Sequence, residues 1–82
     1  MDLGLIKTVL DVLAAAAGRD NYTLEVVTTD SELRQRRPIP VHQVQSAMTE
    51  CVSRGWATEA VDDFRQATFA ITTEGRAKQV HF

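Results

Sequence analysis

Residues 38–56 read PIPVHQVQSAMTECVSRGW, and this segment has the two boundaries and the periodicity of a helix. Pro40 suits a helix start, because its φ is already helical and its missing N–H is not needed there. Arg54 and Gly55 suit a helix end, since glycine takes the left-handed conformation without steric cost. Between them, apolar residues recur at helical spacing, at Val41, Val44, Met48, Cys51 and Val52. The segment therefore predicts a helix over residues 41–54.

Two short stretches of alternating polarity follow this helix, at residues 56–61 and 67–72. The segment between them, DDFRQ at 62–66, is polar apart from one phenylalanine. Strand-like stretches on both sides of a short polar segment are typical of a β-hairpin. We therefore expect a hairpin with a modest tip.

A last helix is expected after the hairpin. Thr72 or Thr73 can cap its N-terminus, and Glu74 is favourable in its first turn. Ala77 and Val80 are then expected to face inward.

Upstream, the sequence predicts a short strand and a short helix. Residues 22–27 alternate and are mostly β-branched or aromatic, which favours a strand. Thr29 and Glu32 have the spacing of a capping box, so a short helix is expected over residues 30–36. Pro38 should end this helix, because its ring disfavours helical geometry at the preceding residue.

The N-terminal segment is expected to form a helix that is apolar over more than half of its circumference. Asp2 is its expected N-cap and Gly18 its expected end. One apolar stripe consists of Leu3, Ile6, Leu10, Leu13 and Ala17. A second stripe consists of Leu5, Val9, Val12 and Ala16. This second stripe has two interpretations: it packs in the chain's own core, or it forms the contact of a homodimer.

Length and composition restrict the class of protein. A chain of 82 residues has room for one domain, placed at residues 1–82, and its fractions of 44% hydrophobic and 24% charged residues are ordinary for globular proteins. No apolar run is long enough to span a bilayer and no signal peptide is recognisable, so a cytoplasmic protein is expected. Cys51 is the single cysteine and lies on an apolar stripe, where a buried structural thiol is expected.

No pattern of catalytic or metal-binding residues is recognisable. His42 and His81 have no second histidine, cysteine or carboxylate at ligand spacing, so no metal site is expected. The sequence contains no nucleophile with a base at recognisable spacing and no glycine-rich phosphate loop. We therefore expect neither an enzyme nor a cofactor.

The formal charge of −2 is unevenly distributed. Residues 1–33 carry two basic side chains against six acidic ones, whereas residues 34–54 carry four arginines against one glutamate. Three of these arginines cluster at Arg34, Arg36 and Arg37. Positive charge concentrated in this way is suited to contacts with phosphates.

Three groups of residues in this order resemble the winged helix-turn-helix superfamily, especially its MarR-type and PadR-type regulators. TDSEL at 29–33 is similar to the start of the family's second helix. VQSAM at 44–48 and CVSRGW at 51–56 are similar to its third helix, and FAITTEGR at 69–76 to the end of its wing. The resemblance covers about residues 29–78. It implies an α+β winged-helix fold, with a three-helix core, a short β-hairpin wing and a short C-terminal helix.

The resemblance further implies that residues 41–54 form a recognition helix and that the protein binds double-stranded DNA. It would act as a transcriptional regulator or as a phage-type or plasmid-type accessory factor. The outward face of the helix carries side chains that hydrogen-bond to base edges, and the arginines would contact phosphates. The expected DNA-binding residues are Arg34, Arg36, Arg37, His42, Gln43, Gln45, Ser46, Thr49 and Arg65.

A second hypothesis is a winged-helix interaction module or dimerisation domain that binds protein and not DNA. Asp62 and Asp63 favour it, because only Arg65 balances them at the hairpin tip and a wing that grips phosphate carries basic residues. Arg37 also stands where the family usually has an apolar residue, which affects how the turn after the second helix packs. A polar face on residues 41–54 is equally compatible with plain solvent exposure.

Overall fold

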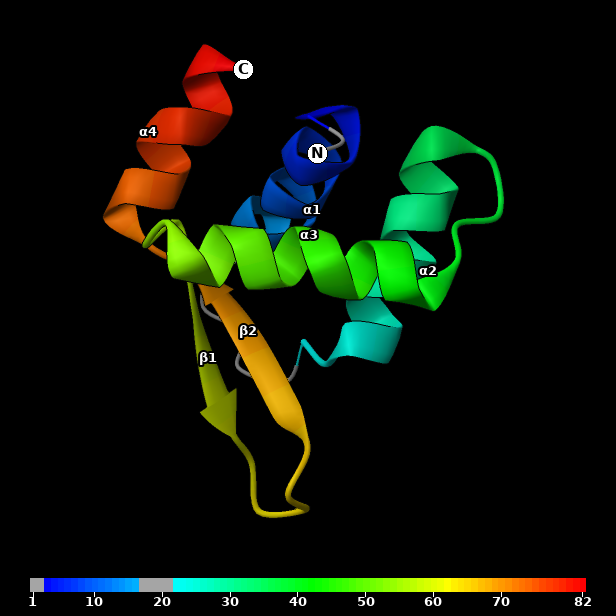
Figure 1. Cartoon of the computed structure of the whole chain (residues 1–82), viewed down its shortest axis with the longest axis vertical. Coiled ribbons are helices and arrows are strands. Elements are labelled where there is room, and N and C mark those ends of the chain that lie inside the picture. Colours follow the sequence, from blue (N-terminus) through cyan, green and yellow to red (C-terminus); the bar gives the residue numbers. More distant parts are fainter. Residues whose placement is uncertain (1–2, 17–21) are drawn as a thin grey trace.

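Four helices and one hairpin make up the part of the chain that the structure, a computed structural model, describes: residues 3–16 and 22–82 (Figure 1). In order they are α1 (Leu3–Ala15), α2 (Leu24–Gln35), α3 (Val41–Ser53), β1 (Ala57–Val61), β2 (Ala67–Ile71) and α4 (Thr73–His81). The hairpin projects from the helices as a wing (Figure 1). The predicted α+β winged helix-turn-helix fold, with its short C-terminal helix, is confirmed.

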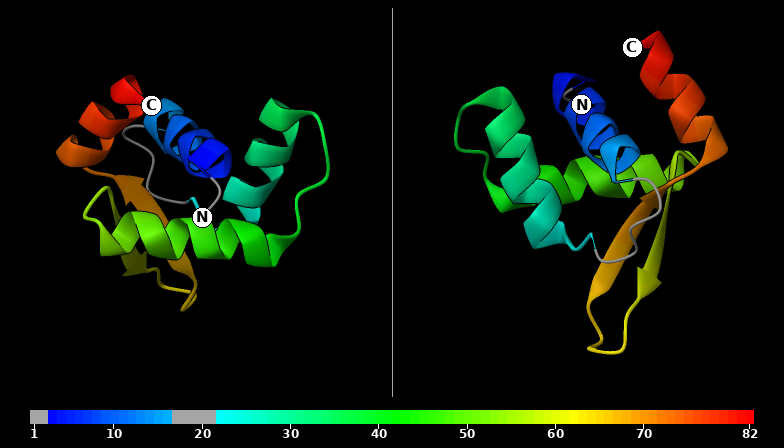
Figure 2. Two further views of the ribbon diagram at one scale, coloured as in Figure 1. Left: turned by 45° about the horizontal axis from the view of Figure 1, so that its top comes forward. Right: turned by 180° about the vertical axis from the view of Figure 1, so that it is seen from behind.

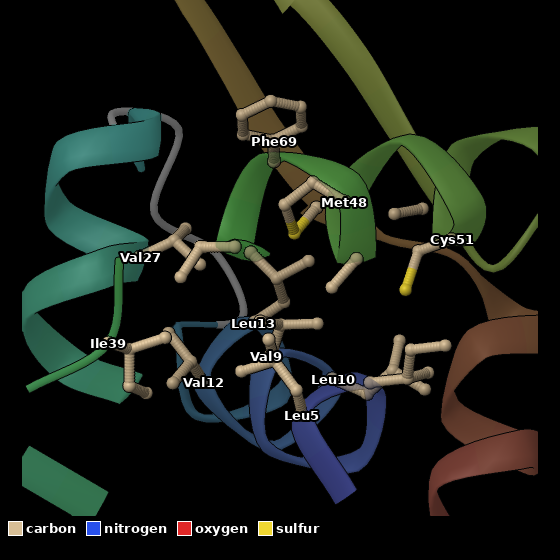
Figure 3. Close-up of a cluster of buried hydrophobic side chains, with 14 residues drawn as sticks. Leu5, Val9, Leu10, Val12, Leu13, Val27, Ile39, Met48, Cys51 and Phe69 are labelled. Carbon is tan, nitrogen blue, oxygen red and sulfur yellow. The ribbon is translucent and has the colours of Figure 1, made fainter. Parts of the chain in front are cut away.

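Helix α1 lies between the other helices (Figure 2), where it packs against α2, α3 and α4. Residues of both apolar stripes are consequently buried and form much of the hydrophobic core (Figure 3), although Leu3 of the first stripe is 54% exposed. The side chains of α1 with 2% exposure or less are Leu5, Ile6, Val9, Leu10, Val12 and Leu13. The expected cap at Asp2 and the expected end of the helix at Ala17 and Gly18 fall outside the described residues.

The second stripe of α1 is therefore used inside the chain. Val9 and Val12 are 0% and 1% exposed and cannot also contact a second copy. The interpretation of this stripe as a homodimer contact was wrong, because a helix covered by three others needs both stripes for its own core. Homodimer formation itself stays a prediction that would require another surface.

The predicted strand over residues 22–27 was wrong. Helix α2 already begins at Leu24, and Thr23 is its N-cap, with a side-chain oxygen that accepts from the N–H of Val26 at 3.4 Å. The extended part is limited to Tyr22 and Thr23: the Tyr22 carbonyl accepts from Phe69 N–H at 2.8 Å, and Thr23 forms an isolated bridge with Thr68. Over so short a window, alternation does not distinguish a strand from a helix.

The capping box was wrong for the same reason, since Thr29 stands in the middle of α2 and not at its start. The carboxylate of Glu32 has a different role: its Oε2 accepts from the N–H of Ile39 at 3.1 Å. This bond secures the turn between α2 and α3. Ile39 is 4% exposed and packs into the core, whereas Arg37 is exposed.

The predicted helix at residues 41–54 is confirmed as α3, with Pro40 as its N-cap and Arg54 as its C-cap. Gly55 follows with φ +76°, the left-handed conformation that the sequence required of it. The Trp56 N–H then bonds back to the Cys51 carbonyl at 2.9 Å. This turn leads the chain directly from α3 into the wing.

The hairpin pairs β1 and β2 in antiparallel register, from Ala57 opposite Ile71 to Val61 opposite Ala67. Thr72 caps α4, as one of the two expected caps: its Oγ1 accepts from Gly75 N–H at 3.0 Å and donates to the Gly55 carbonyl at 2.6 Å.

The expected inward face of α4 was wrong. Ala77 and Val80 are exposed, and Val80 is 78% exposed. The helix instead turns Gly75 and Gln79 toward its neighbours: Gly75 is buried, and Gln79 Nε2 donates to Asp11 Oδ1 at 2.8 Å. Helix α4 is therefore held by the hydrogen bond of Gln79 and by the close packing at Gly75, and not by the apolar stripe that was expected.

Candidate nucleic-acid interface

Helix α3 separates its side chains into a buried face and an exposed face. Val44, Ala47, Met48 and Cys51 are between 0% and 6% exposed and point into the core. The five predicted interface residues of α3 are exposed, namely His42, Gln43, Gln45, Ser46 and Thr49. Because the buried face fixes the rotation of the helix, the exposed side chains are presented in one defined orientation.

The exposed residues of α3 do not all share one surface. His42, Gln43 and Ser46 line a groove of about 450 Å³ on the side of α1, where Leu5 and Ile6 contribute apolar lining. Gln45 and Thr49 are outside this groove. The interface predicted from sequence therefore divides into an α1-facing flank and an outward part.

A second concave surface joins α2, α3 and the wing, and the sequence analysis missed it. It has a volume of about 570 Å³ and is lined by Thr23, Leu24, Glu25, Thr28, Thr29, Glu32, Val41, Gln66 and Ala67. Five of these residues come from the N-terminal half of α2 or its cap, which had been assigned in part to a strand. The signal that could have found them is the Thr23 cap followed by an acidic residue in the first turn.

The three clustered arginines lie around the C-terminal end of α2. Arg34 is in its last turn, Arg36 is its C-cap in the left-handed conformation with φ 55°, and Arg37 follows. All three are exposed. Figure 1 shows that α2 ends on the side of the molecule opposite the wing. The cluster is thus separated from the wing, and Arg65 at the wing does not extend it.

The wing ends in an ordered turn. Asp62 Oδ1 accepts from the N–H groups of Phe64 and Gln66 at 2.9 and 2.8 Å. The Asp62 N–H donates to the Gln66 carbonyl, and the Asp62 carbonyl accepts from the Arg65 N–H. Arg65 adopts φ 61° and is exposed, and Phe64 is 84% exposed. Asp62 is therefore a structural residue of the turn, while Asp63, Phe64 and Arg65 project from it.

Positive charge on α3 itself is already engaged. Arg54 is ion-paired with Glu50 and lies over the ring of Trp56, 5.3 Å from its centroid. Lys78 of α4 stands over the same ring at 5.4 Å. The exposed side chains Gln43, Gln45, Ser46 and Thr49 of α3 carry no charge, and they can recognise a partner through hydrogen bonds.

Other kinds of site are not apparent in the described part of the chain. Residues 3–16 and 22–82 contain no group of three side chains able to hold a metal ion. None of the described helices is both long and apolar enough to cross a membrane. Cys51 is buried, as its position on the apolar stripe predicted.

Comparisons with known proteins show the fold and not a family. Neither a protein-family model nor a curated protein matches the sequence. RosR from H. salinarum has a TM-score of 0.79 at 19% identity, over 94% of this chain and 66% of that chain.

Two further solved structures are similar over nearly the whole chain. A candidate DNA-binding protein from Ralstonia eutropha JMP134 has a TM-score of 0.74 at 21% identity, over 99% of this chain and 95% of that chain. A transcriptional regulator from Clostridium thermocellum has a TM-score of 0.72 at 18% identity, over 96% and 77%. The chain thus spans slightly less than two thirds of RosR, and most of the other two.

Proposed function

We propose that the protein binds double-stranded DNA through α3 and acts as a transcriptional regulator. The observation that carries this proposal is the exposed face of α3, where Gln45 and Thr49 stand outside the groove beside α1 on a helix whose opposite side is buried in the core. Amide and hydroxyl groups of this kind read base edges in the major groove, which admits a helix. A rigid helix also loses little entropy on binding.

The arginines extend this proposal beyond the recognition helix. Arg36 and Arg37 precede α3 in the chain and would contact the phosphates flanking the groove, and Arg65 would do so from the wing. The names of two similar structures, a candidate DNA-binding protein and a transcriptional regulator, support the same function. A MarR-type or PadR-type mode of action is a finer part of the proposal and depends on the motifs of the sequence.

A protein partner is the second candidate function, and the wing favours it. Glu59, Asp62 and Asp63 outnumber Arg65 in the outer part of the hairpin, so this surface repels phosphate. Val61 and Phe64 beside them are 69% and 84% exposed. Apolar side chains among carboxylates suit a protein surface better than a nucleic-acid backbone.

A salt titration separates the two candidates. Affinity for a mixed-sequence duplex is measured by fluorescence anisotropy at increasing salt. For a protein that contacts phosphates, the logarithm of the binding constant falls linearly with the logarithm of the salt concentration, with a slope of about −0.9 per contact. The Arg36→Asn, Arg37→Ala double variant should flatten the slope by up to about two units; asparagine is used because residue 36 has φ 55°. Arg76→Ala, an exposed arginine on α4, is the control. Absence of duplex binding at low salt would exclude the proposal.

A further inference from the structure

Two surfaces of the molecule, one on the wing and one at the C-terminal end of α2, are complementary in charge and in polarity. One is the outer part of the hairpin, residues 59–66, named here the wing tip. The other is a groove at the C-terminal end of α2, named here the arginine groove, which is lined by Thr29, Glu32, Leu33, Arg36, Arg37 and Pro38. Figure 1 shows the wing extending away from the end of α2.

The wing tip is acidic on balance, with Glu59, Asp62 and Asp63 against Arg65, and it is partly apolar. Phe64 is 84% exposed, which is more than any other large apolar side chain of the described residues. Asp63 and Glu59 are exposed as well. Asp62 holds the turn rigid through two hydrogen bonds from backbone N–H groups. Burial of an exposed apolar side chain is favourable, and little conformational entropy is lost when the turn that carries it is already ordered.

The arginine groove has the opposite character. Its volume is about 500 Å³, and Arg36 and Arg37 on its rim are exposed. Leu33 in its lining is 71% exposed and offers apolar surface next to the guanidinium groups. Glu32, the acidic residue of the lining, is engaged with the N–H of Ile39. The groove thus presents two cations and a leucine, with the Glu32 carboxylate leaving a net charge of +1 in its lining.

We propose that the wing tip of one copy docks into the arginine groove of a second copy, with Phe64 against Leu33 and Asp63 near Arg36 and Arg37. The charges of the two surfaces are opposite, and each surface has an exposed apolar side chain that the other can cover. The contact is head to tail, since each surface meets a different one. Each docked pair therefore retains one free wing tip and one free groove, and the assembly can grow along a line.

This inference does not depend on DNA binding, but the two events share Arg36 and Arg37. A duplex whose phosphates occupy the arginines would displace the wing tip of the neighbouring copy. Self-association is therefore measured without DNA, so that failure of either proposal can be recognised separately.

Two single-surface variants test the contact by sedimentation velocity at low salt. Phe64→Ala removes the apolar anchor of the wing tip and keeps the groove. The Arg36→Asn, Arg37→Glu variant removes the groove charges and keeps the wing tip; asparagine is chosen because residue 36 has φ 55° and asparagine tolerates that conformation. Val80→Ala, at an equally exposed apolar position on α4, is the matched control. Circular dichroism establishes that every variant is folded.

The wild type and Val80→Ala should form species larger than two chains as concentration rises, and salt should weaken them. Each surface variant alone should remain monomeric at concentrations where the wild type associates. For Phe64→Ala, the dissociation constant of self-association should rise about tenfold or more. Mixed together, the two variants should form a complex of one chain each that does not grow, because each variant contributes one intact surface.

Three results would overturn the proposal. A wild type that is monomeric up to about millimolar concentration, the range of weak specific contacts, shows that there is no docking. Association that survives both variants places the interface elsewhere. A mixture that stays monomeric shows that the two surfaces do not bind each other. If the groove variant does not fold, Asp63→Lys tests the same charge contact from the wing and should lower association on its own.

Discussion

Gly75 of α4 stands in direct contact with the backbone carbonyl of Trp56. A Cβ placed on Gly75 would lie 1.9 Å from that oxygen and 2.9 Å from Ile71 Cγ1. The oxygen cannot simply retreat, because it also accepts from the N–H of Thr72 at 3.0 Å. Glycine at this position is what allows α4 to approach the junction between α3 and the wing.

Gly75→Ala should therefore destabilise the protein, although alanine is the better helix former. The methyl group must push α4 away from Trp56, and overpacking of this kind costs about 1 to 3 kcal/mol. In a domain of this size about 1 kcal/mol corresponds to a fall in Tm of roughly 4 to 8 °C. Thermal unfolding followed by circular dichroism measures it, with Arg76→Ala as the control on the exposed side of α4. An unchanged Tm would mean that α4 does not dock as described.

The cap of α4 can be tested with two neighbouring threonines. Thr72→Ala removes the oxygen that accepts from Gly75 N–H and donates to the Gly55 carbonyl, so we expect a loss of about 1 to 2 kcal/mol in the free energy of unfolding. Thr73→Ala makes the same chemical change one residue later, at an exposed position inside the helix. Chemical denaturation should show almost no effect for Thr73→Ala. Equal losses in both variants would contradict the assigned cap.

The parts of the fold that were predicted correctly carry strong local signals. The helix at α3 has prolines before it and glycine after it, and its apolar residues are spaced over three turns. The first turns of α2 were missed because few of the apolar residues there are buried: of Leu24, Val26 and Val27, Val27 alone is buried, and Val26 is 36% exposed. A strand pattern and a weak helix pattern are then indistinguishable, and packing against α1 determines the outcome.

The candidate site was predicted as residues but not as a surface. The exposure of Gln45 and Thr49 follows from helical periodicity, which sequence contains. Helical periodicity does not predict the separation between the arginine cluster and the wing, because this separation depends on the direction in which α2 runs. The inward face of α4 was missed because Gly75 and Gln79 have no apolar signature, and their contacts exist only once Trp56 and Asp11 are in place.

Asp11 should make stability depend on pH on the acid side. Burial alone would raise the pKa of this carboxyl, but hydrogen bonds from Lys7 and Gln79, with the charges of Lys7 and Arg34, outweigh burial and lower it. A lowered pKa in the folded state gives stability that is present above the ordinary value of about 4 and is lost as pH falls through the folded value. Asp11→Asn should cost on the order of 1 kcal/mol at neutral pH and less at acid pH.

Unfolding of Asp11→Asn at several pH values measures this effect, and Asp63→Asn on the wing controls for the loss of one carboxylate. The difference from wild type should shrink as the pH falls below about 4. A difference that is constant with pH would show that Asp11 acts through shape alone.

Cys51 should be unreactive in the folded protein. Burial, and to a lesser degree the charge of Glu50, raises the pKa of its thiol to about 11, and the residue is 0% exposed. The thiolate is the reactive form, so a chromogenic disulfide reagent at pH 8 should label it only as fast as the chain opens, and at once in denaturant. The raised pKa also predicts that stability falls as pH rises above the ordinary thiol value of about 8.5. Immediate labelling of the native protein would contradict the buried position.

The recognition face is tested most directly at Gln45 and Thr49, because both are exposed and neither lines the groove beside α1. If they contact base edges, alanine at either position should cost about 1 to 3 kcal/mol of affinity for a selected duplex. Affinity for mixed-sequence DNA and the salt slope should stay unchanged, because neither side chain carries charge. Gln43→Ala removes the same kind of amide group from the flank that faces α1. Its effect on affinity should be smaller if the outward part of α3 enters the major groove of DNA. If all three variants bind the selected and the mixed duplexes with equal affinity, the polar side chains of α3 do not contact bases and form a solvated surface. The second candidate function, binding of a protein through the wing, would then remain.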